Sequence, residues 1–414
     1  MKYVVILGDG MADAPSTKLG GKTPLEVANK PYIDKICQMG KIGMVKTVPD
    51  GFSPGSDVAN LSVMGYDPNE FYTGRSPLEA VSMGIDVLPT DTTFRTNLVT
   101  VSDEDVYEDK TMIDYSSDEI STEESRQLMK AVNDALGTDE YQFFGGISYR
   151  HLLLWHTDIE QVNFTPPHDI TGKKVKEYLP DNAVMLDLMK KSYEILKDHP
   201  VNKSRIERGL RPANSIWMWG QGKKAALMPF EEKYGIKGAV ISAVDLVKGI
   251  GLCANMENID VEGATGNVDS NFEGKANAAI ETLKKNDFVY IHMEAPDESG
   301  HHFDKDAKVL SIELIDQKVV GPVYEYLKNS GEDFAFLIMP DHPTPIDIGT
   351  HTGDPVPYAM YYSNKPENCE LSYTESNGKK GDFIKTGYTR DSKTYAITDL
   401  GREYFADFFA TVKK

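Results

Sequence analysis

The fold is decided by the stretch Tyr3-Val4-Val5-Ile6-Leu7-Gly8-Asp9-Gly10. Its first five residues are apolar without alternation and mostly β-branched, which is typical of a strand buried on both faces of a parallel sheet. The glycines at 8 and 10 end this strand and leave Asp9 at its carboxyl end. Because open α/β sheets bind ligands at the carboxyl ends of their strands, Asp9 is the first candidate site residue.

Strands and helices alternate at both ends of the chain. Residues 31–39 begin with a proline and are followed by a glycine, which predicts a helix between the strand candidate 42–48 and the first strand. This order of elements predicts an α/β fold with a parallel sheet. Further strands are expected at 287–293, 334–339 and 357–362, with helices at 56–64, 275–285, 306–329 and 397–412.

The middle of the chain has a different pattern. The stretch 103–140 is rich in acidic residues and is expected to form exposed loop and helix. We therefore predict a discontinuous catalytic domain from residues 1–74 and 260–414, and a smaller inserted α+β domain, residues 75–259, that serves as a lid. Its candidate elements are strands at 94–101, 149–155, 216–219 and 239–243 and a helix at 186–197.

The composition bounds the class of protein. The chain has 414 residues, of which 40% are hydrophobic, enough to bury a core and to exclude disorder as the default state. With 44 Lys and Arg against 64 Asp and Glu, the formal charge is −20 and the pI about 4.9. Such a field repels nucleic-acid backbones and anionic membranes, so neither is expected as a partner. A small anionic substrate is still compatible, because metal ions or a few arginines can make a site locally positive.

Cysteine usage and hydropathy favour a cytoplasmic protein. The three cysteines form no CxxC pair, which argues against a disulfide framework and a cysteine zinc module. The apolar run at the N-terminus is too short for a signal peptide, and no stretch approaches the ~20 apolar residues of a membrane span. The oligomeric state is not readable from the sequence.

Carboxylate and imidazole side chains occur at the ends of the later strands. Asp297 follows the strand at 287–293 with His301 one helical turn later, and Asp341 and His342 follow the strand at 334–339, with His351 nearby. Aspartate and histidine are ligands of divalent transition metals. Together with the carboxylate after the first strand they are too many for one tetrahedral ion and suit two. Two-metal centres stabilise phosphoryl transfer.

Ser56 is the candidate nucleophile. It opens the predicted helix at 56–64, where backbone N–H groups and the positive end of the helix dipole favour a phosphate, and a metal ion can lower the pKa of its hydroxyl. A serine after glycine is more often a plain N-cap, and a strand-end aspartate is more often a turn residue. The hypothesis therefore rests on the combination of these residues and on no single one.

Eight short motifs occur in a fixed order along nearly the whole chain. They are GDG (8–10), PGSDVANLS (54–62), GYDP (65–68), GRSPLEA (74–80), PHDITGK (167–173), APDESGH (295–301), DH (341–342) and HTGDPVP (351–357). In these motifs the chain resembles the archaeal-type cofactor-independent (2,3-bisphosphoglycerate-independent) phosphoglycerate mutases of the alkaline phosphatase-like metalloenzyme superfamily. The resemblance implies a three-layer αβα domain with an inserted smaller α+β lid domain.

The resemblance also implies a ligand set and a mechanism. One ion would be held by Asp9, Ser56, Asp341 and His342, and the other by Asp297, His301 and His351. Ser56 would become phosphoserine while 2- and 3-phosphoglycerate interconvert, as in glycolysis and gluconeogenesis, with water excluded by the lid. Mn²⁺ is the first expectation for the ions, with Zn²⁺, Co²⁺ and Mg²⁺ as alternatives. Phe303 stands where the family often has a glycine, so the packing behind the ligands is expected to differ, and His302 is expected not to be a ligand.

A substrate with two anionic groups needs arginine side chains that bind carboxylate and phosphate with two hydrogen bonds. A solvent-exposed surface charge is the competing interpretation for each arginine. Asp169, with His168, is a candidate acid–base pair toward glycerate. The candidate substrate-binding residues are Arg75, Arg95, Arg150, His168, Arg208 and Arg211.

Three other functions use some of the same features. A homoserine kinase-like phosphotransferase has been proposed for some bacterial members of this branch, although the chain has no GxxxxGK[ST] or GxGxxG segment to hold a nucleotide. A plain phosphomonoesterase would release free phosphate faster than it isomerises its substrate. A non-catalytic metal-binding protein would have no need of Ser56.

Overall fold

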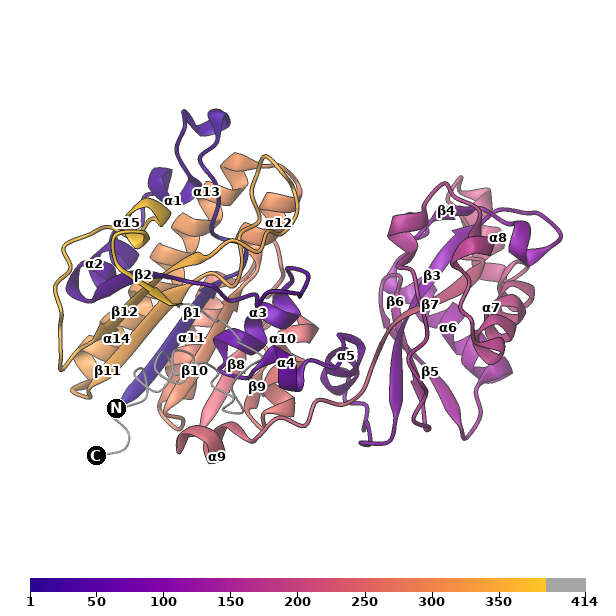
Figure 1. The fold of residues 1–414 in the computed structure, drawn as a ribbon, viewed down its shortest axis with the longest axis horizontal. Coiled ribbons are helices and arrows are strands. Elements are labelled where there is room, and N and C mark those ends of the chain that lie inside the picture. The colour runs from indigo at the N-terminus through magenta and orange to yellow at the C-terminus, as the bar shows by residue number, and fades with distance from the viewer. Residues whose placement is uncertain (385–414) are drawn as a thin grey trace. The chain divides into compact units, whose positions relative to one another are not determined.

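The computed structural model describes residues 1–384, so the helix predicted at 397–412 lies outside the described residues. The chain forms two compact units (Figure 1). The first consists of Met1–Tyr72 and the residues from Leu227 onward, and the second of Thr73–Ala226. The second boundary thus lies at 226/227 and not at the expected 259/260, because residues between 238 and 259 pair with the large sheet of the first unit.

The first unit is built on a sheet whose described strands have the order β13-β2-β12-β11-β1-β10-β8-β9. β1 lies in the middle and pairs in parallel with β10 on one side and β11 on the other. Its residues Tyr3 to Leu7 are completely buried, as the apolar run predicts. The strands are β1 (Lys2–Gly8), β2 (Lys41–Val45), β8 (Gly238–Ile241), β9 (Glu257–Ile259), β10 (Phe288–Met293), β11 (Phe334–Met339), β12 (Val356–Tyr362) and β13 (Asp382–Ile384).

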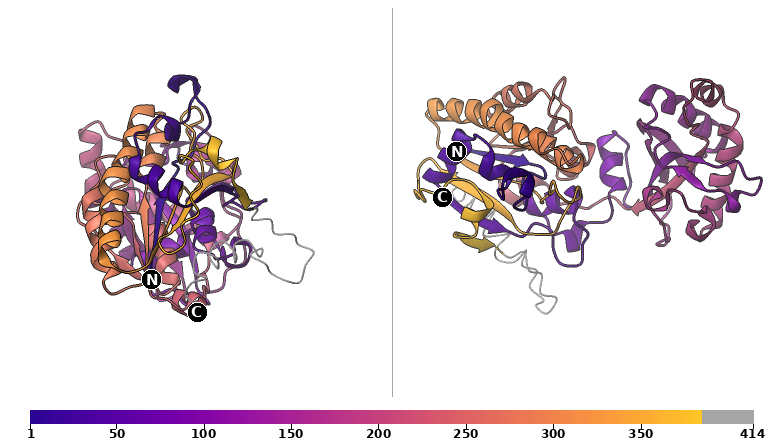
Figure 2. Two further views of the ribbon diagram at one scale, coloured as in Figure 1. Left: turned by 90° about the vertical axis from the view of Figure 1, so that its left-hand side faces the viewer. Right: turned by 90° about the horizontal axis from the view of Figure 1, so that it is seen from above.

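Helices cover both faces of this sheet. Val4 and Ile6 point into a core with α2, α11, α13 and α14, which form a layer on one face (Figure 2). Tyr290 points to the other face, where its hydroxyl donates to Asn60 of α3. The helices are α1 (Pro24–Val27), α2 (Pro31–Met39), α3 (Ser56–Val63), α4 (Pro68–Phe71), α9 (Phe230–Tyr234), α10 (Asp245–Cys253), α11 (Phe272–Leu283), α12 (Ala295–His301), α13 (Lys305–Leu314), α14 (Gly321–Ser330) and α15 (Glu375–Gly378). The predicted α/β class with three layers is confirmed.

The second unit is an antiparallel sheet covered by helices. β3 is its centre and pairs with β4, β6 and β7, while β5 pairs with β6. Phe94, Leu98 and Trp217 pack into the core with α6 and α7. The elements are α5 (Ser76–Ser82), β3 (Thr92–Val101), β4 (Met112–Asp114), α6 (Thr122–Leu136), β5 (Tyr141–Ile147), β6 (Arg150–Trp155), α7 (Ala183–Leu196), α8 (Pro200–Glu207) and β7 (Ser215–Gly222).

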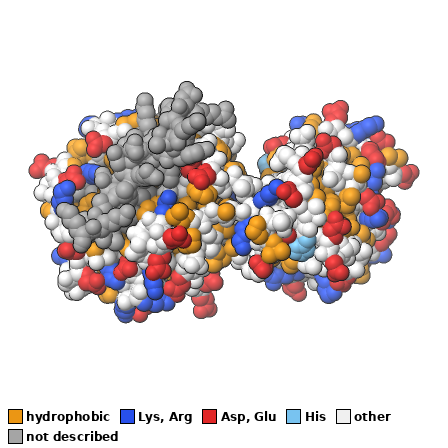
Figure 3. Space-filling model, turned by 60° about the horizontal axis from the view of Figure 1, so that its bottom comes forward, with side chains coloured by type: hydrophobic (Ala, Val, Ile, Leu, Met, Phe, Trp, Pro, Cys, Tyr) orange, Lys and Arg blue, Asp and Glu red, His pale blue; other side chains and the backbone are white. Residues whose placement is uncertain are grey.

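The charge distribution on the surface and the character of the helices can be compared with what the net charge and the hydrophobic content predict. On the face drawn in Figure 3, acidic and basic side chains are interspersed, and no continuous basic surface is visible there. Among the described residues, no helix combines the length and the apolar character that a membrane span requires.

Candidate metal centre

The parallel pairing of β1, β10 and β11 brings three ligand-bearing segments to one edge of the sheet. Leu7 of β1 is in register with His292 of β10 and with Met339 of β11, so the residues that follow these strands meet. Asp9 follows β1, Asp297 lies in the first turn of α12 just after β10, and Asp341 follows β11. All three carboxylates are at least nine-tenths buried.

Ser56 lies beside the first group of ligands. It is the first residue of α3, and its Oγ is 3.1 Å from His342 Nε2. The same Nε2 lies 3.5 Å from Asp9 Oδ1 and 3.4 Å from Asp341 Oδ2. The four residues expected to hold one ion are therefore neighbours in the structure.

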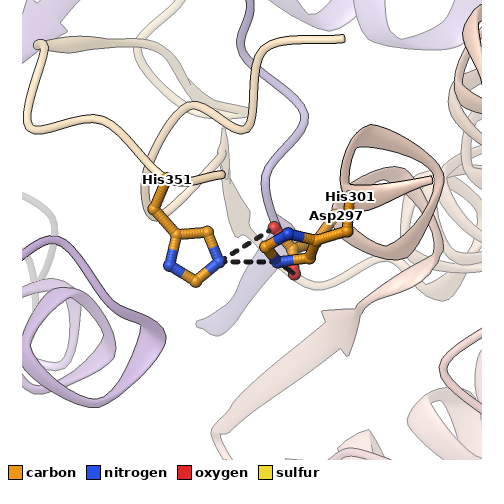
Figure 4. A group of neighbouring side chains, drawn as sticks. All are labelled: Asp297, His301 and His351. Carbon is orange, nitrogen blue, oxygen red and sulfur yellow. Dashed lines mark hydrogen bonds and ion pairs between the residues drawn. The ribbon is translucent and has the colours of Figure 1, made fainter. Parts of the chain in front are cut away.

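Asp297, His301 and His351 form the second group (Figure 4). His301 Nε2 is 3.2 Å from Asp297 Oδ2, and His351 Nε2 is 3.4 Å from Asp297 Oδ1. The two histidines come from distant parts of the chain, yet their Nε2 atoms are only 2.9 Å apart.

The hydrogen bonds of the two imidazoles direct both Nε2 atoms toward one place. Both Nδ1 atoms face backbone carbonyls, His301 at 3.0 Å from Gly349 O and His351 at 3.4 Å from Pro54 O, so each Nδ1 carries the hydrogen. Each Nε2 therefore faces the other and an oxygen of Asp297. In the metal-free chain these contacts are hydrogen bonds, and a metal ion would take the place of the shared hydrogen.

A separate observation, at Asp9, indicates that the first group of ligands can bind a cation. Asp9 Oδ1 is buried and has no hydrogen-bond partner among the described atoms, although a buried carboxylate oxygen normally has one. Burial raises the pKa of Asp9 well above its ordinary value, and the nearby carboxylates of Asp341 and Asp297 raise it further. A divalent ion would remove this repulsion and bind the free oxygen.

Asp297 lies between the two groups. It belongs to both groups of side chains that could hold an ion, with Asp9 and His342 in one and with the histidine pair in the other. Although burial acts to raise it, the hydrogen bonds from His301 and His351 hold the pKa of Asp297 well below its ordinary value. The arrangement therefore suits two ions on either side of one carboxylate.

Three residues with no predicted role orient the ligands. His292 Nε2 donates to Asp9 Oδ2 at 2.8 Å, and its Nδ1 accepts from Ser242. Asn60 Nδ2 donates to Asp341 Oδ2 at 2.9 Å and to the Ser56 carbonyl at 2.8 Å. Thr344 donates to Asp297, and its Oγ1 lies 3.3 Å from His342 Nδ1. Such partners fix the tautomer and direction of metal ligands. For His292 the sequence did hold a signal of such a role, because a polar residue within a buried apolar strand needs a polar partner.

A buried ion pair joins two of the ligand-bearing segments. Lys308 Nζ is 2.9 Å from Asp13 Oδ2 and donates to the carbonyls of Ala12 at 3.3 Å and Thr344 at 2.7 Å. The three donors of the ammonium group are all used. Lys308 therefore holds the segment after β1 against the segment after β11.

Metal affinity of the second group should depend on pH. The hydrogen bond with Asp297 raises the pKa of His301 to about 9 in the metal-free chain. Because a metal ion has to displace this proton, we expect the affinity for the second ion to rise about tenfold per pH unit below that pKa and to level off above it. Calorimetric titration of the metal-free chain with Mn²⁺ across the pH range measures the slope. A flat affinity below the pKa of His301 would contradict this ligand role.

The candidate substrate residues all belong to the second unit. Arg75 and Arg95 each lie 3.1 Å from one oxygen of Glu79, and the Arg95 guanidinium stacks 4.4 Å from the Trp219 ring centroid. Burial lowers the pKa of Arg95, and the charges of Arg75 and Arg150 lower it further. Arg75 and Arg95 thus share the Glu79 carboxylate, and Arg150 lies close enough for its charge to act on Arg95.

His168 and Asp169 lie next to this cluster. The His168 ring is 5.6 Å from the ring of Trp219, which covers Arg95, and its Nε2 is 3.7 Å from Asp169 Oδ1. Both side chains are exposed. They are therefore accessible to a ligand bound at the arginines.

Arg208 and Arg211 pair with other acidic residues of the second unit. Arg208 pairs with Glu124, which also binds Arg205. Arg211 Nη1 is 3.1 Å from Asp114 and 2.9 Å from Asp118. Both arginines thus pair with carboxylates other than Glu79.

Comparison with known proteins identifies the family. The sequence profile of the 2,3-bisphosphoglycerate-independent phosphoglycerate mutases matches residues 37–202. A relative of that name from Methanosarcina barkeri is 51% identical over 388 residues, covering 92% of this chain and 96% of the relative. A relative from Geobacter sulfurreducens, described as a probable enzyme of the same name, is 47% identical, covering 93% and 96%.

Solved structures agree with this family. A protein from Pyrococcus horikoshii is 28% identical with a TM-score of 0.80 and covers 99% of this chain and 97% of its own. The cofactor-independent phosphoglycerate mutase from Thermoplasma acidophilum is 26% identical with a TM-score of 0.64, covering 93% and 96%. On this evidence the chain belongs to the family of 2,3-bisphosphoglycerate-independent phosphoglycerate mutases.

Proposed function

We propose that the chain interconverts 2- and 3-phosphoglycerate, without a nucleotide or 2,3-bisphosphoglycerate, by passing the phosphoryl group through Ser56. The observation that carries the proposal is the position of Ser56 Oγ, 3.1 Å from His342 Nε2 at the edge of the buried aspartate and histidine cluster. A structural metal site has no need of an accessible hydroxyl there. The alternative homoserine kinase is not favoured, because the relatives that cover nearly the whole chain are named as mutases.

Divalent metal ions are part of this proposal. Asp9, Ser56, Asp341 and His342 would hold one ion, and Asp297, His301 and His351 the other. When bound, the ions supply positive charge for the phosphoryl oxygens and lower the pKa of the serine hydroxyl. Mn²⁺ is the ion we propose first, as the family resemblance implies, and ligands of this kind also accept Zn²⁺ and Co²⁺.

The residues around Ser56 give it a fixed direction. Asn60 binds both the Ser56 carbonyl and Asp341, and its own Oδ1 accepts from Tyr290 at 2.6 Å. The N-cap Gly55 has no side chain to bond the N–H groups of the first turn of α3. Asp57 Oδ1 accepts from the N–H of Val58 at 2.9 Å, so the N–H groups of Ser56 and Asp57 are the ones that can bind a phosphate on Ser56. Ser56 Oγ would take the phosphoryl group and give it back to the other hydroxyl of glycerate, so no net hydrolysis occurs.

The arginine cluster is the proposed site for the anionic groups of the substrate. Arg75 and Arg95 both pair with Glu79, and Arg150 adds a third positive charge that acts on the same groups. His168 and Asp169, beside Trp219, are the proposed acid–base pair that moves a proton to or from the glycerate hydroxyls. Arg208 and Arg211 are bound to acidic partners, and the proposal does not depend on them.

Incubation of the Mn²⁺-loaded protein with 3-phosphoglycerate and no nucleotide tests the function. We expect 2-phosphoglycerate as the product, with little free phosphate. Phosphate release much faster than isomerisation would indicate a phosphomonoesterase. No isomerisation, together with ATP-dependent phosphorylation of homoserine, would contradict the mutase.

A further inference from the structure

Phe303 has an unusual backbone conformation. It directly follows His302, the C-cap of α12, and its φ is +58°. Its N–H donates to Gly300 O at 3.0 Å, and the N–H of Asp304 donates to Ser299 O at 3.0 Å, which ends the helix. The left-handed residue that ends a helix in this way is usually glycine, because a side chain is crowded in that conformation. A phenylalanine persists there only if its side chain gains something in return.

The Phe303 ring packs against Gly349. A Cβ atom placed on Gly349 would lie 2.3 Å from Cζ and 2.6 Å from Cε1 of the ring, so the ring touches the backbone directly. Gly349 has a φ of +73° and donates its own N–H to Pro345 O at 2.8 Å. Because Phe303 is 54% exposed, this contact buries only part of the ring, and burial of apolar surface is a weak reason to retain it.

The backbone that the ring touches carries a hydrogen bond to a proposed ligand. The carbonyl of Gly349 accepts from His301 Nδ1 at 3.0 Å, which directs His301 Nε2 toward Asp297. His351 follows Gly349 after one intervening residue, and its Nε2 lies 2.9 Å from that of His301. The backbone at position 349 therefore fixes the tautomer of His301 and the place from which the His351 side chain extends.

We propose that Phe303 is a positioning residue for the second metal ion. Its ring holds Gly349 in place, and this contact keeps His301 and His351 in their binding geometry. The strain at Phe303 is the cost of placing the ring there. This inference rests on the proposed assignment of the two histidines as ligands.

Two substitutions distinguish the effect of the Phe303 ring from the effect of the backbone strain at this position. Phe303→Gly removes both, whereas Phe303→Ala removes the ring and keeps a side chain in the left-handed conformation. Ile348→Ala is the matched control, because Ile348 lies in the same segment and is 53% exposed. Each metal-free chain is melted and then titrated with Mn²⁺ by calorimetry, and the Nδ1–H of His301 is followed by ¹⁵N NMR.

We expect both Phe303 variants to bind the second Mn²⁺ about tenfold more weakly or worse, with the first ion and the Ile348→Ala control unchanged. Phe303→Gly should nevertheless melt at a higher temperature than Phe303→Ala, because it relieves the backbone strain. Wild-type affinity in Phe303→Gly, or an equal loss in Ile348→Ala, would overturn the positioning role. A wild-type chain that binds one ion only would instead overturn the ligand assignment on which the role rests.

Discussion

Replacement of Ser56 by alanine is expected to lower kcat by at least about 10⁴-fold, the size of loss that follows removal of a nucleophile in an enzyme that works by covalent catalysis. Ser56 Oγ is the hydroxyl that lies at the edge of the cluster, 3.1 Å from His342 Nε2. The variant also loses one proposed ligand of the first ion, so the first Mn²⁺ should bind more weakly while the second is unaffected, and kcat is compared at saturating Mn²⁺.

Formation of 2-phosphoglycerate, followed by ³¹P NMR, measures this loss. Acid-quenched wild-type protein should carry one phosphoryl group on the peptide that contains Ser56, and the variant should carry none. Ser62→Ala is the control, because it makes the same change further along α3 and should keep full activity. If Ser56→Ala turned over at the wild-type rate, the phosphoserine scheme would fail for any substrate.

Replacement of Asp9 by asparagine is expected to have opposite effects on activity and stability. The amide loses the negative charge that binds the first ion, so activity should fall to the level of the metal-free protein. In the metal-free chain its oxygen can still accept from His292, and its NH₂ group can donate at the place where Asp9 Oδ1 has no partner. We therefore expect the metal-free variant to be more stable by about 1–3 kcal/mol at neutral pH.

The pH dependence of this stability difference follows from the pKa of Asp9. Burial and the neighbouring carboxylates raise that pKa well above 3.8, so the folded chain holds the proton more tightly than the unfolded chain. Asp9 therefore contributes a loss of stability as the pH rises above 3.8, and this contribution is absent from the asparagine variant. Urea unfolding of both metal-free proteins at acidic and neutral pH measures the difference, with the exposed Asp50→Asn as control. A variant less stable than wild type at neutral pH would contradict the repulsion that we infer.

The sheet of the first unit was predictable because its strands are long apolar runs. β1, β10 and β11 lie within a residue or two of the predicted ranges, and the helix at 31–39 has its predicted ends. α12 was not predicted, since its seven residues carry little apolar periodicity. The predicted helix 306–329 is α13, a π-helical stretch (Ile315–Val320) and α14, because Pro322 cannot continue regular hydrogen bonding.

The boundary at 226/227, where the chain returns from the second unit to the first, could not be predicted from the sequence. The run Gly238–Ile241 is short and apolar and fits either sheet equally well. Only its parallel pairing with β10 assigns it to the first unit, and such pairing joins residues that are distant along the chain.

Site residues at strand ends were accessible from the sequence, whereas their supporting residues were not. Asp9, Asp297 and Asp341 follow recognisable strands, and parallel pairing brings such positions together. The role of His292 depends on which strand lies beside β1, and the partners of Arg208 depend on the packing of α6 and α8. Neither the order of the strands nor the packing of these helices produces a local pattern in the sequence.

The central claim is that two divalent ions lie beside the Ser56 hydroxyl. Anomalous diffraction from a crystal of the Mn²⁺-loaded protein, recorded at the manganese edge, tests it most directly. We predict two peaks, one bounded by Asp9, Ser56, Asp341 and His342 and one bounded by Asp297, His301 and His351. A single peak, or peaks out of reach of Ser56 Oγ, would contradict the account.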